Sequence, residues 1–318
     1  MQIDLKTALH LVDNPSESDT QSLIVPKGFV VPGAWVIFAS TARRHHVAAD
    51  DIYFPNRKAS EYSSAIGFND CVFGEDDYQY CRKNVGSTYS PLTRLDCVES
   101  TDAANNQIVG CVRAMLSDPD LQGGVDLMNV IGELHDNVWA HGKSTGVSMA
   151  QKWKDRDNGG RSAIEFALAD TGHGFLRELR RYGKAADNDI QAIEWCVAKN
   201  NSTKHADDDD DWAQSVPEDI MGGSPFGAAV PRVTSRLNHQ GLGLWKLTEL
   251  IRKYRGKLTL VSGTGCLQMD TNGQMMYSSC PEWQGVALSC RLYEDELGRE
   301  EDEPDDQVAA IMERLGGL

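Results

Sequence analysis

Residues 126–142 read DLMNVIGELHDNVWAHG, and this stretch decides which fold the sequence predicts. Its apolar residues recur every three or four positions, which predicts an amphipathic helix with Asp126 as its N-cap and Gly142 at its end. Glu133 and Asn137 are four residues apart, so both side chains project from one face of that helix. A carboxylate and an amide on one face suit a site for Mg²⁺ and a nucleophile. On its own, however, the pair is better explained as a polar helix surface.

A second motif follows a predicted β-hairpin of residues 145–169, whose second strand alternates apolar residues. It reads DTGHG and spans residues 170–174. At a strand end, the carboxylate of Asp170 can accept a hydrogen bond from an amino group such as that of adenine. Gly172 and Gly174 allow close approach of the backbone to a ligand. The motif alone also fits an ordinary strand-to-helix turn.

A third motif, QGLGL at residues 240–244, comes directly before a predicted helix of residues 244–255. Glycines that open a helix leave N–H groups and the positive end of the helix dipole free to bind an anion such as a phosphate chain. Residues 200–240, before this motif, are irregular and rich in Gly, Pro and Asp. Segments of this length in a compact domain are usually ligand lids or disordered.

The order of the three motifs resembles the GHKL (HATPase_c) superfamily, over about residues 100–293. Its members include gyrase-type topoisomerases, heat-shock chaperone ATPases, mismatch-repair ATPases and the kinase domains of two-component sensors. The resemblance implies the Bergerat fold, an α/β (α+β) two-layer sandwich in which helices cover one face of a mixed sheet. It also implies that ATP and Mg²⁺ bind between these helices and a lid, which residues 200–240 would form.

The resemblance assigns a role to individual positions. Glu133 matches the catalytic carboxylate, Asn137 the Mg²⁺ ligand, and Asp170 the group that binds the adenine amino group. The further ATP-binding positions are Gly172, Gly174, Gly241, Leu242, Gly243 and Leu244.

Two features of the sequence separate it from many members. Where they carry Gly-Thr, whose hydroxyl helps to bind adenine, this chain has Gly285-Val286. The lid segment carries five consecutive aspartates, residues 207–211, which would repel a triphosphate unless they face away from it. The sequence E-x-x-x-N-x-x-x-H-G also looks like the N box of anti-sigma-factor serine kinases. Its His141 either approaches phosphate or interacts with the helix dipole, and both interpretations stand.

Three functions follow from this resemblance. The first is an ATPase whose lid-coupled switch controls a regulatory protein partner. The second is a protein serine/threonine kinase of the anti-sigma type, and the third is a nucleotide-gated binding module without catalysis. Self-phosphorylation is not expected, because His135 lies inside the motif assigned to ATP. A homodimer is a further option, since many members dimerise.

Composition bounds these expectations. Of a net charge of −16 on 318 residues, most lies in residues 207–211 and 294–318, so the remaining chain is nearly neutral and no nucleic-acid partner is expected. The chain has no apolar run of membrane-spanning length, its first residues lack the basic region and apolar run typical of a signal peptide, and its eight cysteines form no C-x-x-C pair. We therefore expect no membrane contact, reduced cysteines and a cytoplasmic location.

The two ends of the chain complete the predicted organisation. Residues 1–95 form a mixed α/β unit of unknown role, in which residues 29–39 are expected to be strands broken by Pro-Gly. Residues 294–318 are an acidic tail with a short amphipathic helix.

Overall fold

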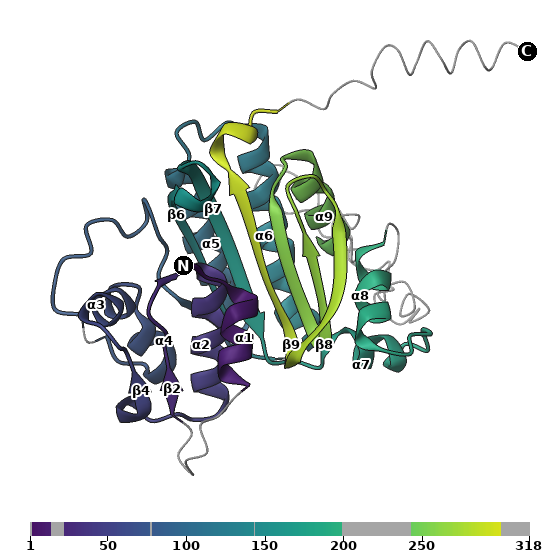
Figure 1. The fold of residues 1–318 in the computed structure, drawn as a ribbon, viewed down its shortest axis with the longest axis horizontal. Helices are drawn as coiled ribbons and strands as arrows, with labels where there is room; N and C mark the ends of the chain where they lie inside the picture. Colours follow the sequence, from purple (N-terminus) through teal and green to yellow (C-terminus); the bar gives the residue numbers. More distant parts are fainter. Residues whose placement is uncertain (1, 14–21, 77, 143, 199–242, 300–318) are drawn as a thin grey trace, which may run out of the picture.

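The centre of the molecule is a five-stranded sheet in which every neighbouring pair of strands is antiparallel (Figure 1). The structure is a computed structural model that describes residues 2–13, 22–76, 78–142, 144–198 and 243–299. The strands lie in the order β5-β6-β7-β9-β8. Their bounds are β5 Thr93–Leu95, β6 Gly146–Asp155, β7 Arg161–Asp170, β8 Lys257–Met269 and β9 Met275–Tyr293.

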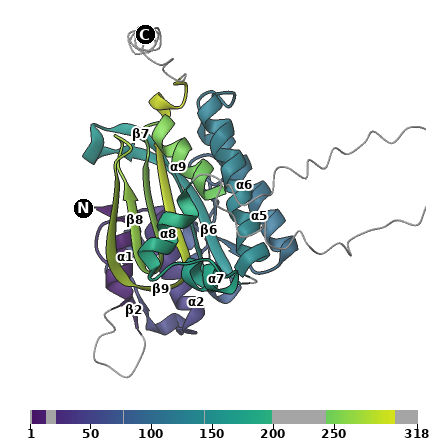
Figure 2. The same cartoon turned by 90° about the vertical axis from the view of Figure 1, so that its right-hand side faces the viewer.

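Long helices cover one face of this sheet (Figure 2). Their apolar sides pack on strand residues that point towards them, such as Phe166 and Leu168 of β7. Because side chains alternate along a strand, this face takes every second residue of β7. The helices of this layer are α5 Val98–Met115, α6 Gln122–Gly142, α8 Asp189–Val197 and α9 Gly243–Lys253, and the short helix α7 Gly174–Arg181 lies beside α8.

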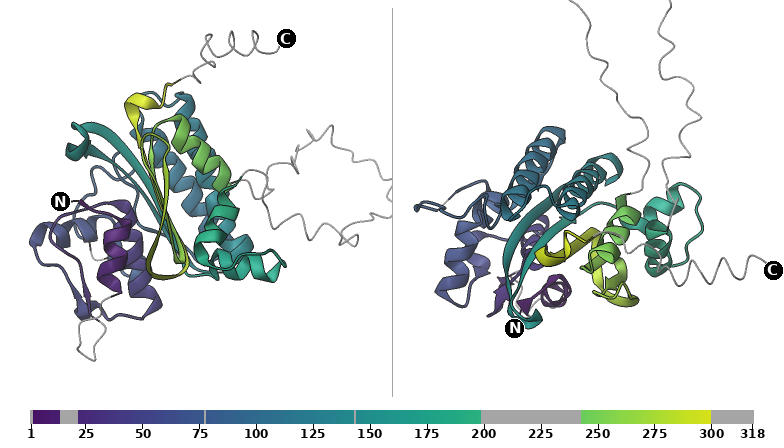
Figure 3. Two further views of the ribbon diagram at one scale, coloured as in Figure 1. Left: turned by 45° about the vertical axis from the view of Figure 1, so that its right-hand side comes forward. Right: turned by 90° about the horizontal axis from the view of Figure 1, so that it is seen from above.

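The opposite face is covered by α1 (Leu5–Val12) and α2 (Pro32–Arg44), so the molecule has three layers (Figure 3). The expected two-layer sandwich, with helices on one face, was therefore wrong in the number of layers. Small strand residues such as Ala167 and Ala169 let α2 approach closely, and α2 is buried along most of its length. Residues of 2–95 and of the sheet thus share one apolar core.

The remaining N-terminal elements are short and lie around these two helices. Two parallel pairs of two-residue strands, one 3-10 turn and two further α-helices complete this region of the described chain. They are β1 Gln2–Ile3 with β3 Phe29–Val30, β2 Leu23–Ile24 with β4 Ile52–Tyr53, η1 Ala49–Asp51, α3 Arg57–Ala65 and α4 Phe68–Phe73. The 3-10 turns elsewhere are η2 Arg156–Asn158 and η4 Glu294–Glu296.

Two expected elements differ from the structure. Residues 29–39 are mainly the first part of α2 rather than strands, because Pro32 stands at the first helical turn, where its missing N–H is tolerated. Helix α6 begins at Gln122 rather than after an N-cap at Asp126, whose carboxylate instead accepts hydrogen bonds from Gln122 Nε2 and Tyr254 Oη at 2.7 and 2.8 Å. The resemblance implies a mixed sheet. In the described chain, however, all neighbouring strands of the five-stranded sheet are antiparallel.

Other expectations are confirmed or lie outside the description. The hairpin before DTGHG is β6–β7, and the helix after QGLGL is α9. The predicted tail helix lies outside the described residues. Within the residues that the structure covers, no helix combines the length and apolarity needed to cross a bilayer.

Candidate functional site

Asp170 ends β7 on the same face of the sheet as the long helices. It follows Phe166 and Leu168 at intervals of two, and both of those side chains pack in the helix-side core. Its neighbour across the hairpin is Gly146, and a side chain at Gly146 would lie 3.3 Å from Val138 of α6. The carboxylate of Asp170 therefore lies under the C-terminal part of α6, directly after Asn137.

Burial sets the electrostatics of this carboxylate. Asp170 is only 8% exposed, and burial raises its pKa to about 6. The Gly172 N–H donates to Asp170 Oδ1 at 2.8 Å, and the Val286 N–H also favours the charged form. The Ser144 hydroxyl also lowers the pKa of Asp170. Its distance or angle to the carboxylate does not meet the geometry of a regular hydrogen bond, and it has no other hydrogen-bond partner among the described residues. No cation is among the causes of the shift, so only neutral groups compensate this charge.

Three consecutive residues of β9, Trp283 to Gly285, pack around Asp170. Trp283 Nε1 donates to the Asp170 backbone oxygen at 3.1 Å, and Gln284 Nε2 donates to the Thr171 carbonyl at 3.2 Å. Gly285 has φ of 101°, and a Cβ there would lie 2.6 Å from Asp170 Oδ1. Only glycine fits this position, because any side chain would collide with the carboxylate.

The second glycine of DTGHG is also required by its surroundings. Gly174 has φ of 72°, and a Cβ there would lie 2.9 Å from Ser262 Oγ. The same hydroxyl accepts a hydrogen bond from the Phe175 N–H at 2.9 Å, which satisfies a free donor at the start of α7. Ser262 thus connects β8 to the loop that carries Asp170.

The first and third motifs meet where α6 and α9 pack together. A Cβ on Gly243, the first residue of α9, would lie 3.3 Å from Glu133 Oε2 and 3.4 Å from Asn137 Nδ2. The absence of a side chain at Gly243 leaves these two polar groups beside the start of the helix. Glu133 Oε1 forms an ion pair with Lys246, while the side chain of Asn137 has no hydrogen-bond partner within the described chain.

The histidine between these groups has a different role. His135 is fully buried, with Nε2 3.0 Å from Ser148 Oγ and Nδ1 3.4 Å from Asn105 Oδ1. Burial lowers its pKa to about 4, so it is neutral at physiological pH. His135 is a hydrogen-bonded core residue.

The structure brings together some of the predicted residues and leaves others undescribed. Glu133, Asn137 and Gly243 are neighbours, and Asp170, Gly172 and Gly174 form one loop on the same side of the sheet. Leu244 is half-buried and packs on the helix-side core. The positions outside the description are Gly241, Leu242, the segment 200–240 and the side chain of His141.

Sequence reasoning missed several residues that hold this arrangement. Lys246 lies one helical turn after Gly243, and its position on the α6 side of α9 is visible only once the two helices are packed. Ser262 and Trp283 act across strands that are far from the motifs in sequence. Val286, by contrast, was already named from the sequence, and it is half-buried against the helix-side core.

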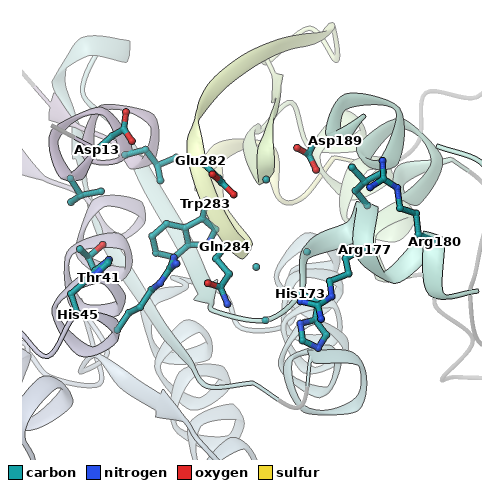
Figure 4. A pocket seen from close by; sticks show the side chains of 18 residues that line it. Asp13, Thr41, His45, His173, Arg177, Arg180, Asp189, Glu282, Trp283 and Gln284 are labelled. Carbon is teal, nitrogen blue, oxygen red and sulfur yellow. The ribbon is translucent and has the colours of Figure 1, made fainter. Parts of the chain in front are cut away.

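A cleft of about 810 Å³ opens beside the DTGHG loop, between α1 and α2 on one side and α7 on the other (Figure 4). His173 and Arg177 line one wall, and Thr41 and His45 line the other. Trp283, which donates to the backbone of Asp170, forms part of the cleft as well. The side chain of His173 therefore faces this cleft.

Comparisons of the chain with protein-family models, with curated proteins and with solved structures returned no match. The resemblance to the GHKL superfamily thus rests on the three sequence motifs alone.

Proposed function

We propose that this chain binds ATP with Mg²⁺ on the helix-covered face of its sheet, in a Bergerat-type arrangement, and hydrolyses it to switch a protein partner. One observation carries the proposal. Motifs separated by more than a hundred residues place the Gly243 backbone against Glu133 and Asn137, and Asp170 points to the same face. A polar helix surface or an ordinary turn, the simpler explanation of each motif, does not predict that they share one face.

The residues fit the parts of a nucleotide in turn. Asp170 Oδ1 already accepts the Gly172 N–H, and its second oxygen is suited to accept an adenine amino group. The half-buried apolar side chains of Phe175, Leu244 and Val286, which pack on the helix-side core, suit the faces of a purine ring. The first N–H groups of α9 suit phosphate oxygens.

Mg²⁺ would be held by Asn137, whose amide oxygen is a hard ligand and whose side chain is unpartnered in the described structure. When bound, Mg²⁺ neutralises the charge of the phosphates. The described chain has no cluster of three or more His, Cys, Asp or Glu residues able to hold a metal, so the remaining ligands would be phosphate oxygens and water.

Glu133 supplies the proton acceptor of the proposed reaction. Its side chain is 22% exposed, so water reaches it, and Lys246 holds it in place. A carboxylate oriented in this way accepts a proton from an attacking water molecule. The carboxylate of Glu133 thus would act on the nucleophile, and Asn137, one helical turn later, on the phosphate side.

Incubation with γ-labelled ATP, Mg²⁺ and cell extract tests this function. We expect slow release of labelled phosphate that is at least about tenfold slower in Glu133→Gln, a loss of about 1.4 kcal/mol of transition-state stabilisation. Label on a second protein would favour the serine/threonine kinase instead, and tight ATP binding without any product would favour the binding module. Calorimetry showing no uptake of ATP with Mg²⁺ would refute all three.

A further inference from the structure

Two cysteines lie next to each other on the side of the β8–β9 hairpin that faces α1. Cys266 of β8 is opposite Ser278 of β9, and Cys280 is two residues further along, on the same side of its strand. Cys266 is fully buried and Cys280 is half-buried. The Cys280 S–H lies between two acceptors, the sulfur of Cys266 and the Gly265 carbonyl oxygen, which is 3.6 Å from Cys280 Sγ.

A cation lies beside this pair. Lys6 Nζ of α1 donates to Gln268 Oε1 at 3.1 Å and to Ser278 Oγ at 3.4 Å, which holds the ammonium over the hairpin. The hydrogen bond from Cys280 lowers the pKa of Cys266 to about 7, the Lys6 charge acts in the same direction, and burial opposes both. The pKa of Cys280 is raised, first because its S–H is hydrogen-bonded to Cys266, then by burial and by the charge of the neighbouring thiolate. The pair therefore loses one proton near neutral pH and retains the other.

The other described cysteines have no such arrangement. Burial raises the pKa of Cys71, Cys196 and Cys290 to about 12, which leaves them as inert thiols. The reactivity of a cysteine follows its thiolate fraction and its access to solvent. In the part of the chain that the structure covers, only the 266–280 pair places a cysteine of lowered pKa, Cys266, next to a half-buried one, Cys280.

We propose that Cys266 and Cys280 are a redox modification site, which a peroxide converts from a dithiol into an intramolecular disulfide. The thiolate attacks one oxygen of hydrogen peroxide and the O–O bond breaks, so that a sulfenic acid forms and the other oxygen leaves as hydroxide, which takes up the proton released by the pair. The second thiol then attacks the sulfenic sulfur, an S–S bond forms, and water leaves with the hydroxyl group and a proton. In total two thiols are oxidised and one peroxide is reduced to two waters. Cys266 carries the thiolate and is the attacking sulfur, and the half-buried Cys280 beside it is the second thiol, which resolves the sulfenic acid.

The position of the pair connects this modification to the rest of the fold. The β8–β9 register shifts between Ser262 and Gly265, directly before Cys266. In this irregular segment, the carboxylate of Asp189 in α8 accepts a hydrogen bond from the Thr264 N–H at 2.9 Å. Ser262 Oγ accepts one from the Phe175 N–H in the first turn of α7. A disulfide here would fix the irregular segment and, through it, the positions of α7 and α8. This inference does not depend on nucleotide binding.

Mass spectrometry of the full-length chain tests the proposal. After mild treatment with hydrogen peroxide, trapping with N-ethylmaleimide and digestion, we expect a cross-linked peptide that joins residues 266 and 280. The intact mass falls by about 2 Da before trapping, and dithiothreitol restores it. The melting temperature of the oxidised chain rises and returns on reduction, because the cross-link restricts the unfolded chain.

Matched variants separate this site from general oxidation. Cys280→Ser and Cys266→Ser each abolish the cross-link, and Cys196→Ser leaves it intact. In Cys280→Ser, the remaining Cys266 reacts with dimedone as a sulfenic acid. The proposal is overturned if Cys266 and Cys280 of the wild-type chain both still react with N-ethylmaleimide at peroxide doses that oxidise the exposed Cys81. A cross-link between other cysteines would overturn it as well, and both results are read from the unmodified sequence, whether or not the variants fold.

Discussion

Two buried carboxylates on one strand show how the two faces of the sheet differ. Glu165 and Asp170 both belong to β7, and both are almost fully buried. Glu165 faces α2, where Arg291 lies 2.8 Å away and the Gly33 N–H donates at 2.9 Å. Asp170 faces the long helices, where the groups that favour its charge are backbone N–H groups and one hydroxyl.

The partners of the two carboxylates indicate which buried acid has a structural role. The guanidinium of Arg291 also forms an ion pair with Asp155, donates a hydrogen bond to Gln2 Oε1 and lies over the ring of Trp153. The charge of Glu165 is thus compensated within a network of protein groups. Burial still raises the pKa of Glu165, but the direct cation opposes this shift. Asp170 has no such cation, and a carboxylate left in this state is a candidate for binding a ligand donor. Substitutions at the two positions should therefore separate stability from nucleotide binding.

Glu165→Gln should have the largest effect, and it should be on folding. The change removes one of the two carboxylates paired with the buried Arg291 guanidinium and leaves Asp155 as the other, and breaking a buried ion pair costs about 3–5 kcal/mol. Urea unfolding should show a decrease in the free energy of unfolding of this size. Glu61→Gln, which removes an exposed ion pair with Arg57, should leave that free energy unchanged within error. A loss of stability no larger than that of the control would show that the network does not hold α2 on the sheet.

Asp170→Asn should reverse this pattern. The amide nitrogen cannot accept the adenine amino group, so we expect ATP affinity to fall about 10- to 100-fold, or about 1.4–2.7 kcal/mol. The free energy of unfolding at neutral pH should not fall, because the variant no longer buries a charge without a cation. Calorimetry with ATP and Mg²⁺ and urea unfolding, both at pH 7.5, provide the two numbers. Unchanged affinity in a folded variant would remove Asp170 from the site.

The pH dependence of ATP binding tests the same carboxylate without substitution. Since its pKa is raised to about 6 from 3.8, the acceptor is ionised only above that value. ATP affinity should therefore rise with pH from about 5 to 7, by up to tenfold per pH unit below 6. The contribution of Asp170 to stability has the opposite sign, because the folded state holds the proton more tightly. That contribution is fully present below pH 3.8 and is lost as pH rises through 6.

His135 opposes this trend over an overlapping range of pH. Its pKa is lowered to about 4 from 6.5, so stability is lost as pH falls through this window. Of these two contributions, Asp170→Asn removes the first and keeps that of His135. The variant should therefore lose stability on acidification from pH 6.5 to 4 more steeply than the wild type, by a difference on the order of 3 kcal/mol. Parallel stability curves would show that Asp170 titrates normally.

The sequence predicted local elements and the composition of the site better than the layers. Glu133 and Asn137 could be placed on one helix face, and Asp170 at a strand end, because periodicity along the chain fixes both. The second covered face could not be predicted, because α2 is apolar all round and has no amphipathic pattern that distinguishes it from strands. Contacts across the chain were also out of reach. The Lys246–Glu133 ion pair depends on how α9 packs on α6, and Ser262 and Trp283 reach the loop from distant strands.

Lys246→Met should have the smallest effect and tests whether the phosphate side of the site is where α9 begins. The ion pair with Glu133 is partly exposed, with side chains 34% and 22% accessible, so its loss should change the free energy of unfolding by less than about 1 kcal/mol. The ammonium is nevertheless close to Gly243, where a phosphate chain would lie, and ATP affinity should fall about two- to fivefold, less at high salt. Lys253→Met is the matched control, because it removes the same charge from the last turn of the same helix. An equal loss in the control would mean that the overall charge of α9 attracts the nucleotide, whereas a loss confined to Lys246 places the phosphates at the N-terminal end of α9, opposite the carboxylate of Asp170.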